Sequence, residues 1–420
     1  MQMEHSSREA ALAAYHRGGP DALALVRSAL LQAPLDGGLL IAEATLLQEM
    51  RAPGATGRLG AMVWRAPDWL DGHVALARLL WGAGDGAFLE PLEQALAALP
   101  RHAGLWMRYM SLLAEGGRPD AAADRAARLR REGGDSPALR LIEAGFAGEA
   151  GQHERAQNLL ARLPADLPGL AKARARQSLR INDPAAGAAL LDRARADDPQ
   201  DGTLWAMSEL AWRATDDPRH SWLLPAGAFG CMEIGLARGE LDELARTLDA
   251  IHDQRWPPLG QSARDGTQTR GHLRMRAEPI FALLFARLEQ AVAAFAAGLP
   301  PVEQGHPLHA ARGPELALRT AWSIRLRGEG RHVSHVHPHG TVSSAFWVQA
   351  PEDGGATNGA LELGRPPADM ALPIEPIAIL TPKAGSLALF PSYLYHGTTP
   401  FSGGQRMSVA FDVGAGRPSP

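Results

Sequence analysis

The stretch that decides the fold runs from His332-Val-Ser-His-Val-His-Pro-His339, through Ser386-Leu-Ala-Leu-Phe-Pro-Ser-Tyr-Leu-Tyr-His396, to Arg406-Met-Ser-Val-Ala-Phe-Asp412. The second run reads as a short strand followed by a turn, and the third as an alternating strand. A strand that delivers a histidine next to a turn suits a ligand at the mouth of a barrel. The stretch therefore predicts a β-rich module with a polar cavity.

Three histidines of this stretch have the spacing of a metal site. In an extended segment His335, His337 and His339 share one face, while His332 points away. His396, on a later strand, can complete a set of nitrogen ligands around the same ion. Imidazole suits Fe(II), Zn, Cu or Ni, so these ligands alone do not select the metal. The alternative is a solvated histidine-rich loop. Because a proline precedes it, His339 can instead lie at the mouth of the pocket as a substrate contact.

Arg406, which follows His396 by ten residues, narrows the choice of ligand. A planar guanidinium binds a carboxylate through two parallel hydrogen bonds. The turn at Phe401-Ser-Gly-Gly404 allows a hairpin that places both side chains in one cavity. Ser408 lies on the same strand face as Arg406 and can share the carboxylate. Arg325, on an earlier strand, is a further candidate for a carboxylate ligand, and a surface arginine is the alternative.

The residues around this stretch complete the β-rich module. Gly, Pro and Asp clusters separate short strand-like runs at the spacing of an all-β barrel or jelly roll. The runs are 321–327, 342–348, 360–363, 377–380, 386–390 and 406–412. Two helices, at 236–251 and 278–297, precede them. Gln261, Arg264 and Gln268 belong to a polar loop that can line the substrate entrance; a loop cap held by backbone hydrogen bonds is the alternative.

The first half of the chain has a different pattern, rich in Ala, Leu and Arg with helical periodicity. Prolines recur at Pro34, Pro67 and Pro100, a spacing of 33. Helix, turn, helix and proline in a period of about 34 residues resemble the tetratricopeptide repeat. We therefore expect an all-α solenoid over 1–215 and a second domain over 216–420. Such a solenoid presents a curved surface that binds a peptide or protein, and a structural role or a homodimer is the alternative.

Composition and charge exclude several classes of function. The 420 residues are enough for two or three domains. A net charge of −4 argues against binding to nucleic acid or to a membrane surface through bulk electrostatics. Cys231 is the only cysteine, which excludes an internal disulfide and a cysteine zinc cluster. No uninterrupted apolar run of about 18 residues predicts a membrane span, and the first residues lack a secretory signal pattern. We therefore expect a cytoplasmic protein, in a setting where Fe(II) persists.

On these motifs, residues 250–414 resemble the 2-oxoglutarate- and Fe(II)-dependent oxygenases with a double-stranded β-helix. The shared pattern consists of Gln261-Ser-x-Arg264-x-Gly-Thr-Gln-Thr269, His306-Pro, Trp322-Ser, His335-x-His337-Pro, Phe390-Pro-Ser-x-Leu-x-His396 and Arg406-x-Ser-Val-Ala-Phe-Asp412. Several members of that group also carry N-terminal tetratricopeptide repeats. The implied fold class is α+β and multidomain: an all-α tetratricopeptide-like solenoid followed by a jelly roll with flanking helices.

The resemblance implies that His335, His337 and His396 ligate Fe(II) and that Arg406 binds the distal carboxylate of 2-oxoglutarate. It implies a dioxygenase that uses O2, releases succinate and CO2, and hydroxylates a peptide or protein side chain presented by the repeat domain. It does not name the substrate. One departure is visible, because the commoner ligand set is two histidines and a carboxylate, whereas the middle position here is His337.

Several alternatives remain open from the sequence. His337 is an iron ligand, or it lies just outside a set of two histidines, or it pairs with His339. The protein as a whole is alternatively a three-histidine metal dioxygenase that does not use 2-oxoglutarate, or a non-catalytic repeat scaffold with a degenerate barrel. Loss of cosubstrate affinity in Arg406→Ala would separate the first of these from an oxoglutarate enzyme. A structural zinc module is disfavoured, because a barrel core folds without metal.

Overall fold

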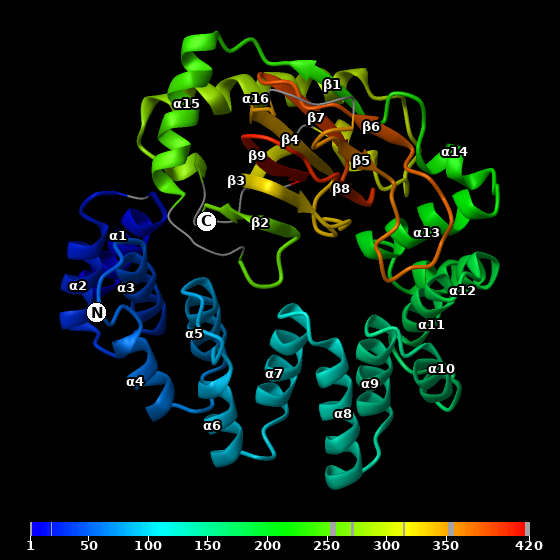
Figure 1. The fold of residues 1–420 in the computed structure, drawn as a ribbon, viewed down its shortest axis with the longest axis horizontal. Coiled ribbons are helices and arrows are strands. Elements are labelled where there is room, and N and C mark those ends of the chain that lie inside the picture. The colour runs from blue at the N-terminus through cyan, green and yellow to red at the C-terminus, as the bar shows by residue number, and fades with distance from the viewer. Residues whose placement is uncertain are drawn as a thin grey trace.

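The computed structural model describes residues 2–17, 19–252, 258–269, 273–313, 316–351 and 357–415. Helices make up its N-terminal half, and antiparallel strands with two long helices make up the rest. The helices of the first half form an arc that curves along one side of the β-rich part (Figure 1). Their bounds are α1 Gln2–Arg17, α2 Ala22–Gln32, α3 Gly37–Glu49, α4 Gly57–Arg65, α5 Leu70–Gly82, α6 Glu90–Ala98, α7 Ala103–Glu115, α8 Pro119–Gly133, α9 Pro137–Glu149, α10 His153–Ala161, α11 Leu170–Arg180, α12 Pro184–Asp197, α13 Gly202–Ala214 and α14 Arg219–Leu223.

A contact between a helix and the proline that precedes it recurs along the arc. The indole N–H of Trp106 on α7 donates to the carbonyl oxygen of Pro100 at 2.9 Å. The indole N–H of Trp205 on α13 donates to the carbonyl oxygen of Pro199, also at 2.9 Å. Both prolines lie in turns between helices, where a residue without a backbone N–H is tolerated. The predicted proline spacing thus marks the boundaries between helices.

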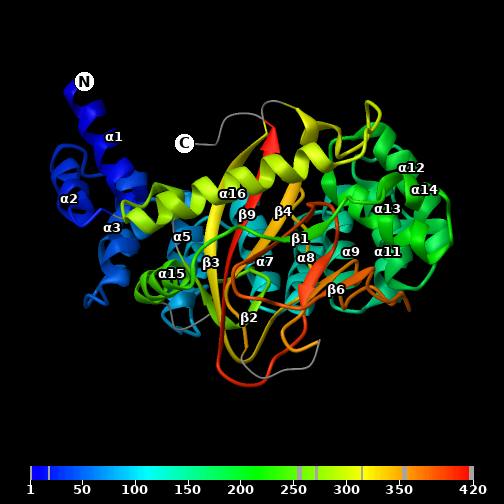
Figure 2. The same ribbon diagram turned by 90° about the horizontal axis from the view of Figure 1, so that it is seen from above.

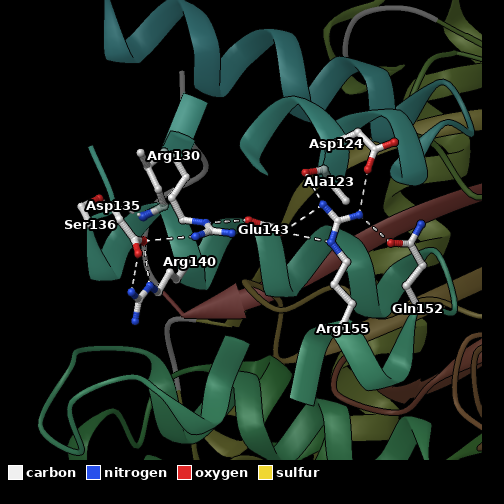
Figure 3. A network of polar contacts seen from close by, with 10 residues as sticks. Ala123, Asp124, Arg130, Asp135, Ser136, Arg140, Glu143, Gln152 and Arg155 are labelled. Carbon is white, nitrogen blue, oxygen red and sulfur yellow. Dashed lines mark hydrogen bonds and ion pairs between the residues drawn. The ribbon is translucent and has the colours of Figure 1, made fainter. Parts of the chain in front are cut away.

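Neighbouring helices of the arc are also joined by a buried carboxylate (Figure 3). Glu143 on α9 is only 2% exposed. It accepts hydrogen bonds at 2.9 Å from Arg130 of α8 and from Arg155 of α10. Arg155 also donates to Asp124 of α8 at 2.8 Å. Because a buried charge is unfavourable unless it is paired, this network favours one relative placement of three consecutive helices.

The strands form two antiparallel sheets. Their bounds are β1 Gly230–Glu233, β2 Ala263–Gln268, β3 Leu316–His332, β4 Val342–Gln349, β5 Leu361–Leu363, β6 Ala378–Leu380, β7 Ser386–Pro391, β8 His396–Thr398 and β9 Gln405–Ala415, with helices α15 Arg238–Ile251, α16 Pro279–Gly298, η1 Leu273–Met275 and η2 His309–Arg312. The large sheet has the order β1-β7-β4-β9-β3-β2 and the small sheet the order β6-β5-β8. Every predicted strand and both predicted helices overlap an observed one, whereas β1, β2 and β8 were not predicted as strands.

Alternate side chains of the large sheet face two different layers. Phe346 and Phe411 belong to a core that also contains the inner faces of α15 and α16. Figure 2 shows α16 running across the strands of this sheet. Trp347 and Phe390 point the other way and pack against Leu363 of the small sheet. The large sheet is therefore covered by helices on one face, and its other face is available for the small sheet and a cavity.

Helix α16 is the one described helix that is long and apolar enough, by length and composition, to cross a membrane. Its buried side chains are Ile280, Phe281, Leu284, Phe285, Leu288, Ala291, Val292 and Phe295. All of them belong to the main core, which they share with the large sheet. This packing accounts for the apolar character of α16 as that of a core helix.

Candidate metal centre

His335, His337 and His396 converge on one point. Their ligand nitrogens all lie within 4.8 Å of one another. Two reciprocal backbone hydrogen bonds, of 3.0 and 2.9 Å, join His335, in the segment after β3, to His396 at the start of β8. The N–H of His337 donates to the Ser392 carbonyl at 3.1 Å. The three rings are therefore placed by backbone contacts between segments that are distant in the sequence.

A hydrogen bond at Nδ1 orients each of the three imidazoles. In both His335 and His396, Nδ1 lies 2.9 Å from the backbone carbonyl oxygen two residues earlier. In His337, Nδ1 lies 2.5 Å from Asp412 Oδ1. Since each partner oxygen accepts a hydrogen bond, Nδ1 carries the hydrogen and Nε2 keeps its lone pair. Metal-bound histidines are oriented in this way, so the three residues fit an Fe(II) ion.

Burial keeps two of these rings neutral. Removal from water lowers the pKa of His335 to about 4, and the neighbouring His337 contributes to the shift. Burial also lowers the pKa of His396 well below its ordinary value, with His335 as a further cause. Neutral imidazole is the form that binds a metal. His335 and His396 are therefore in their metal-binding form at neutral pH.

Arg406 on β9 lines the same cavity as the three histidines. Its side chain is 2% exposed, and its Nε and Nη1 atoms have no hydrogen-bond partner among the described residues. Burial lowers the pKa of Arg406 to about 10, so the guanidinium stays charged at neutral pH. A buried charge without a partner is unfavourable. This residue therefore fits a carboxylate ligand, such as one end of 2-oxoglutarate, held beside the histidines.

The cavity has a volume of about 590 Å³, and eight of the ten predicted site residues line it. Besides the histidines and Arg406, they include Ser408, which shares a strand face with Arg406 because it lies two residues further along β9. Gln261, Arg264 and Gln268 also line the cavity. Arg264 and Gln268 belong to β2, and Gln261 lies two residues before it. Residues from four separate segments thus meet in one cavity.

The segment predicted as a polar loop is the strand β2. Gln268 pairs with Ile324 of β3, and the register shifts between Arg264 and Gly266. At this bulge Asp265 has a φ of 53°, in the left-handed region. The prediction of a loop was wrong because β2 lies at the edge of the sheet. An edge strand takes its backbone hydrogen bonds from one neighbour and can be polar on its exposed side.

Arg325 does not line the cavity, contrary to the prediction. Its guanidinium donates to Asp249 Oδ1 at 2.6 Å and to the His252 carbonyl at 3.0 Å, both near the end of α15. The neighbouring residue Ile324 lines the cavity. Successive side chains of a strand point to opposite faces, so Arg325 points to the helix-covered face of the sheet.

The predictions for His332 and His339 were both wrong: His332 was expected to point away from the site, and His339 to lie in it or at its mouth. His339 is exposed, in a turn that follows His337, and lies outside the cavity. His332 lines the cavity, and its Nδ1 lies 2.9 Å from Ser262 Oγ. β3 ends at His332 and the chain bends before His335. Strand alternation therefore does not extend from one to the other.

The sequence analysis missed one whole wall of the cavity, which comes from the helical arc. Ser111, Ala114 and Glu115 of α7 line it, together with Phe146 and Glu149 of α9. Glu115 and Glu149 end their helices at equivalent places of successive units. This equivalence was the one signal in the sequence for a shared role of the two glutamates. It does not indicate that the ends of these helices face the cavity of the β-rich half.

The comparison with known families agrees with this geometry. Residues 320–412 match the family model described as "Putative 2OG-Fe(II) oxygenase". The match places this segment in the 2OG-Fe(II) oxygenase superfamily. It spans all three histidines and Arg406. The cofactors are Fe(II) and 2-oxoglutarate, in agreement with the family match and with the histidine triad.

Several solved structures resemble part of the chain. A prolyl-4-hydroxylase from Pseudomonas putida is 17% identical over 46% of this chain and 96% of its own, with a TM-score of 0.32. The viral collagen prolyl hydroxylase vCPH from Paramecium Bursaria Chlorella virus-1 is 13% identical over 45% and 97%, with a TM-score of 0.31. HygX from Streptomyces hygroscopicus, with nickel and 2-oxoglutarate bound, is 13% identical over 47% and 87%, with a TM-score of 0.32. No curated protein matches the chain.

Proposed function

We propose that the protein is an Fe(II)- and 2-oxoglutarate-dependent hydroxylase that acts on a side chain of a peptide or protein. One observation carries the cosubstrate part of this proposal. The buried guanidinium of Arg406, without a partner among the described residues, lies in the same cavity as three converging histidines. This charge is unfavourable until an anion binds. A metal dioxygenase that does not use 2-oxoglutarate has no need of a buried cation at this place.

The proposed roles follow from the geometry. His335, His337 and His396 would hold the iron. Arg406 would bind the distal carboxylate of 2-oxoglutarate through two parallel hydrogen bonds, and the Ser408 hydroxyl would donate a third. With O2, the bound iron and 2-oxoglutarate supply the oxidative chemistry, which releases succinate and CO2 and hydroxylates a C–H bond. The chain itself would orient these groups within the cavity, between the sheet and the helical arc.

The peptide substrate is proposed from what adjoins the cavity. A second cavity of about 650 Å³ extends along α9 and α11. The two cavities share Phe146, Glu149 and Val333 in their walls. A small metabolite needs only the first cavity, whereas a polypeptide in both would place one residue at the metal and its neighbours against the helices. We propose that the helices serve here as tetratricopeptide-like repeats that bind the flanking residues.

Anaerobic addition of Fe(II) and 2-oxoglutarate tests the cosubstrate part. We expect the charge-transfer absorbance of metal-bound 2-oxoglutarate, and succinate after air is admitted. The absorbance should be lost in His337→Ala. If wild-type protein produces neither signal, the proposal is wrong. If Arg406→Ala leaves both the 2-oxoglutarate affinity and the succinate yield unchanged, the three-histidine dioxygenase is favoured.

A pool of random-sequence peptides tests the substrate part. Incubated with the protein, Fe(II), 2-oxoglutarate and air, some peptides should gain the mass of one oxygen atom, and succinate should form in proportion. Omission of 2-oxoglutarate is the control. Succinate formation that no peptide or protein accelerates would contradict a polypeptide substrate while leaving the cofactors in place.

A further inference from the structure

The three histidines of the triad differ in what holds them. Two are oriented by uncharged backbone carbonyl oxygens, whereas His337 is oriented by a carboxylate, that of Asp412, at 2.5 Å. Asp412 lies on β9, and its side chain is 18% exposed. Charged acceptors make hydrogen bonds about twice as strong as neutral ones. His337 is thus the member of the triad whose ring Nδ1 is hydrogen-bonded to a carboxylate.

Asp412 is itself held in place. Its Oδ1 atom also accepts a hydrogen bond from the Ser343 hydroxyl at 2.9 Å, and that hydroxyl lies 2.8 Å from Ser392 Oγ. The Ser392 carbonyl in turn accepts the N–H of His337 at 3.1 Å. Ser343 and Asp412 are partners in the register of β4 and β9. The sheet therefore fixes the carboxylate beside Nδ1 of His337.

His337 occupies the place that a carboxylate ligand takes in the commoner set of two histidines and one carboxylate. Three neutral imidazoles would leave the ion with one negative charge fewer. A carboxylate that accepts the Nδ1 proton pushes electron density towards Nε2 and makes the ring a stronger donor. We propose that Asp412 is a positioning residue that supplies this missing charge to the iron through His337. The inference rests on the proposed metal site, and it makes the pair His337–Asp412 the functional equivalent of one carboxylate ligand.

Asp412 is not a fourth ligand in this arrangement. Among the residues that the structure describes, the group of side chains whose ligand atoms lie within 4.8 Å of one another consists of the three histidines. The competing explanation is that Asp412 only joins β4 to β9 through Ser343. The two explanations differ in one respect. A purely structural carboxylate affects folding, whereas a charge delivered through His337 affects the affinity and the spectrum of the metal.

The test uses the full chain and Co(II) alone, whose visible absorption reports its ligands, without 2-oxoglutarate. Asp412→Asn keeps an oxygen that can accept the same hydrogen bonds but removes the charge. Mutation of a residue that orients a metal ligand typically weakens metal binding 10–100-fold, and we expect a loss of about that size when the charge is removed. The matched control is Asp249→Asn, which removes a carboxylate that pairs with Arg325 outside the cavity. It should bind Co(II) as wild-type protein does.

A second readout is independent of affinity. With Fe(II) and 2-oxoglutarate under anaerobic conditions, the charge-transfer band of Asp412→Asn should move to shorter wavelength, because a less electron-rich iron gives up an electron less readily. Wild-type affinity and an unchanged band in a folded Asp412→Asn protein would overturn the inference and leave the proposed function standing. Failure of wild-type protein to bind Co(II) would overturn both.

Discussion

Replacement of Arg406 by methionine should have opposite effects on cosubstrate binding and on stability. The guanidinium is buried and lacks partners at Nε and Nη1 among the described residues. Its charge therefore lowers the stability of the ligand-free protein and is compensated only when an anion binds. Methionine has a similar length and adapts to irregular apolar surroundings. The variant should therefore bind 2-oxoglutarate poorly and yet fold at least as well as wild-type protein.

Both magnitudes follow from the structure. Two hydrogen bonds between charged groups contribute about 1.5–3 kcal/mol each, so their loss should weaken 2-oxoglutarate binding by a factor between roughly a hundred and roughly twenty thousand. Burial lowers the pKa of Arg406 from its ordinary value to about 10. That shift corresponds to an unfavourable free energy of up to about 3 kcal/mol in the folded state. Removal of the charge should raise the free energy of unfolding of the ligand-free protein by an amount up to this size.

The assays are an anaerobic titration of the Fe(II)-loaded protein with 2-oxoglutarate, followed by its charge-transfer absorbance, and urea unfolding without ligands. Arg325→Met is the matched control. Arg325 lies on β3 near Arg406 in register but points to the other face of the sheet, where it pairs with Asp249 at 2.6 Å. Arg325→Met should lower stability and leave 2-oxoglutarate affinity unchanged. If Arg406→Met instead destabilises the ligand-free protein and binds 2-oxoglutarate normally, Arg406 is a structural residue and the reasoning fails.

Three further predictions concern the surroundings of the site. Burial lowers the pKa of His252 from 6.5 to about 3, so protonation favours the unfolded state and stability falls as the pH drops through this range. Between pH 6 and pH 4, urea unfolding should show a loss up to about 2 kcal/mol larger in wild-type protein than in His252→Gln, and equal losses would contradict the assignment. Gly145 lines the second cavity, and a Cβ atom added there would meet no neighbouring atom within 4 Å, so Gly145→Trp should extend into that cavity, block polypeptides and spare 2-oxoglutarate binding. In the peptide-pool assay, unimpaired oxygen incorporation by this variant would argue against a substrate path along α9. Glu143→Gln removes the buried charge shared by two arginines and should lower the free energy of unfolding by about 2–4 kcal/mol, whereas Glu132→Gln, in an exposed pair, should change it by less than about 1 kcal/mol.

The sequence carried most of the information about the secondary structure and much of the site. Strand runs such as 321–327 and 406–412 have an alternation that only one face assignment satisfies, so their elements were predictable. The convergence of the three histidines and Arg406 on one cavity was predictable because the paired histidines occur together with these alternating strands. The outward orientation of Arg325 could also have been predicted, since neighbouring residues of a strand point to opposite faces and Ile324 faces the cavity. β2 was not, because an edge strand can carry a polar sequence that also suits a loop.

What the sequence determined by itself was most of the helices and strands and the chemical types of the candidate ligands, because both depend on local spacing. Only the tertiary structure decided which ends of the helical arc face the cavity, that His332 turns inward while His339 turns out, and that Asp412 stands behind His337. Each of these depends on a contact between segments far apart in the chain. Local sequence does not encode the backbone break between His332 and His335, nor the β4–β9 register that sets the carboxylate against the ring. Such contacts are fixed by how whole layers pack, and that packing is a property of the complete fold.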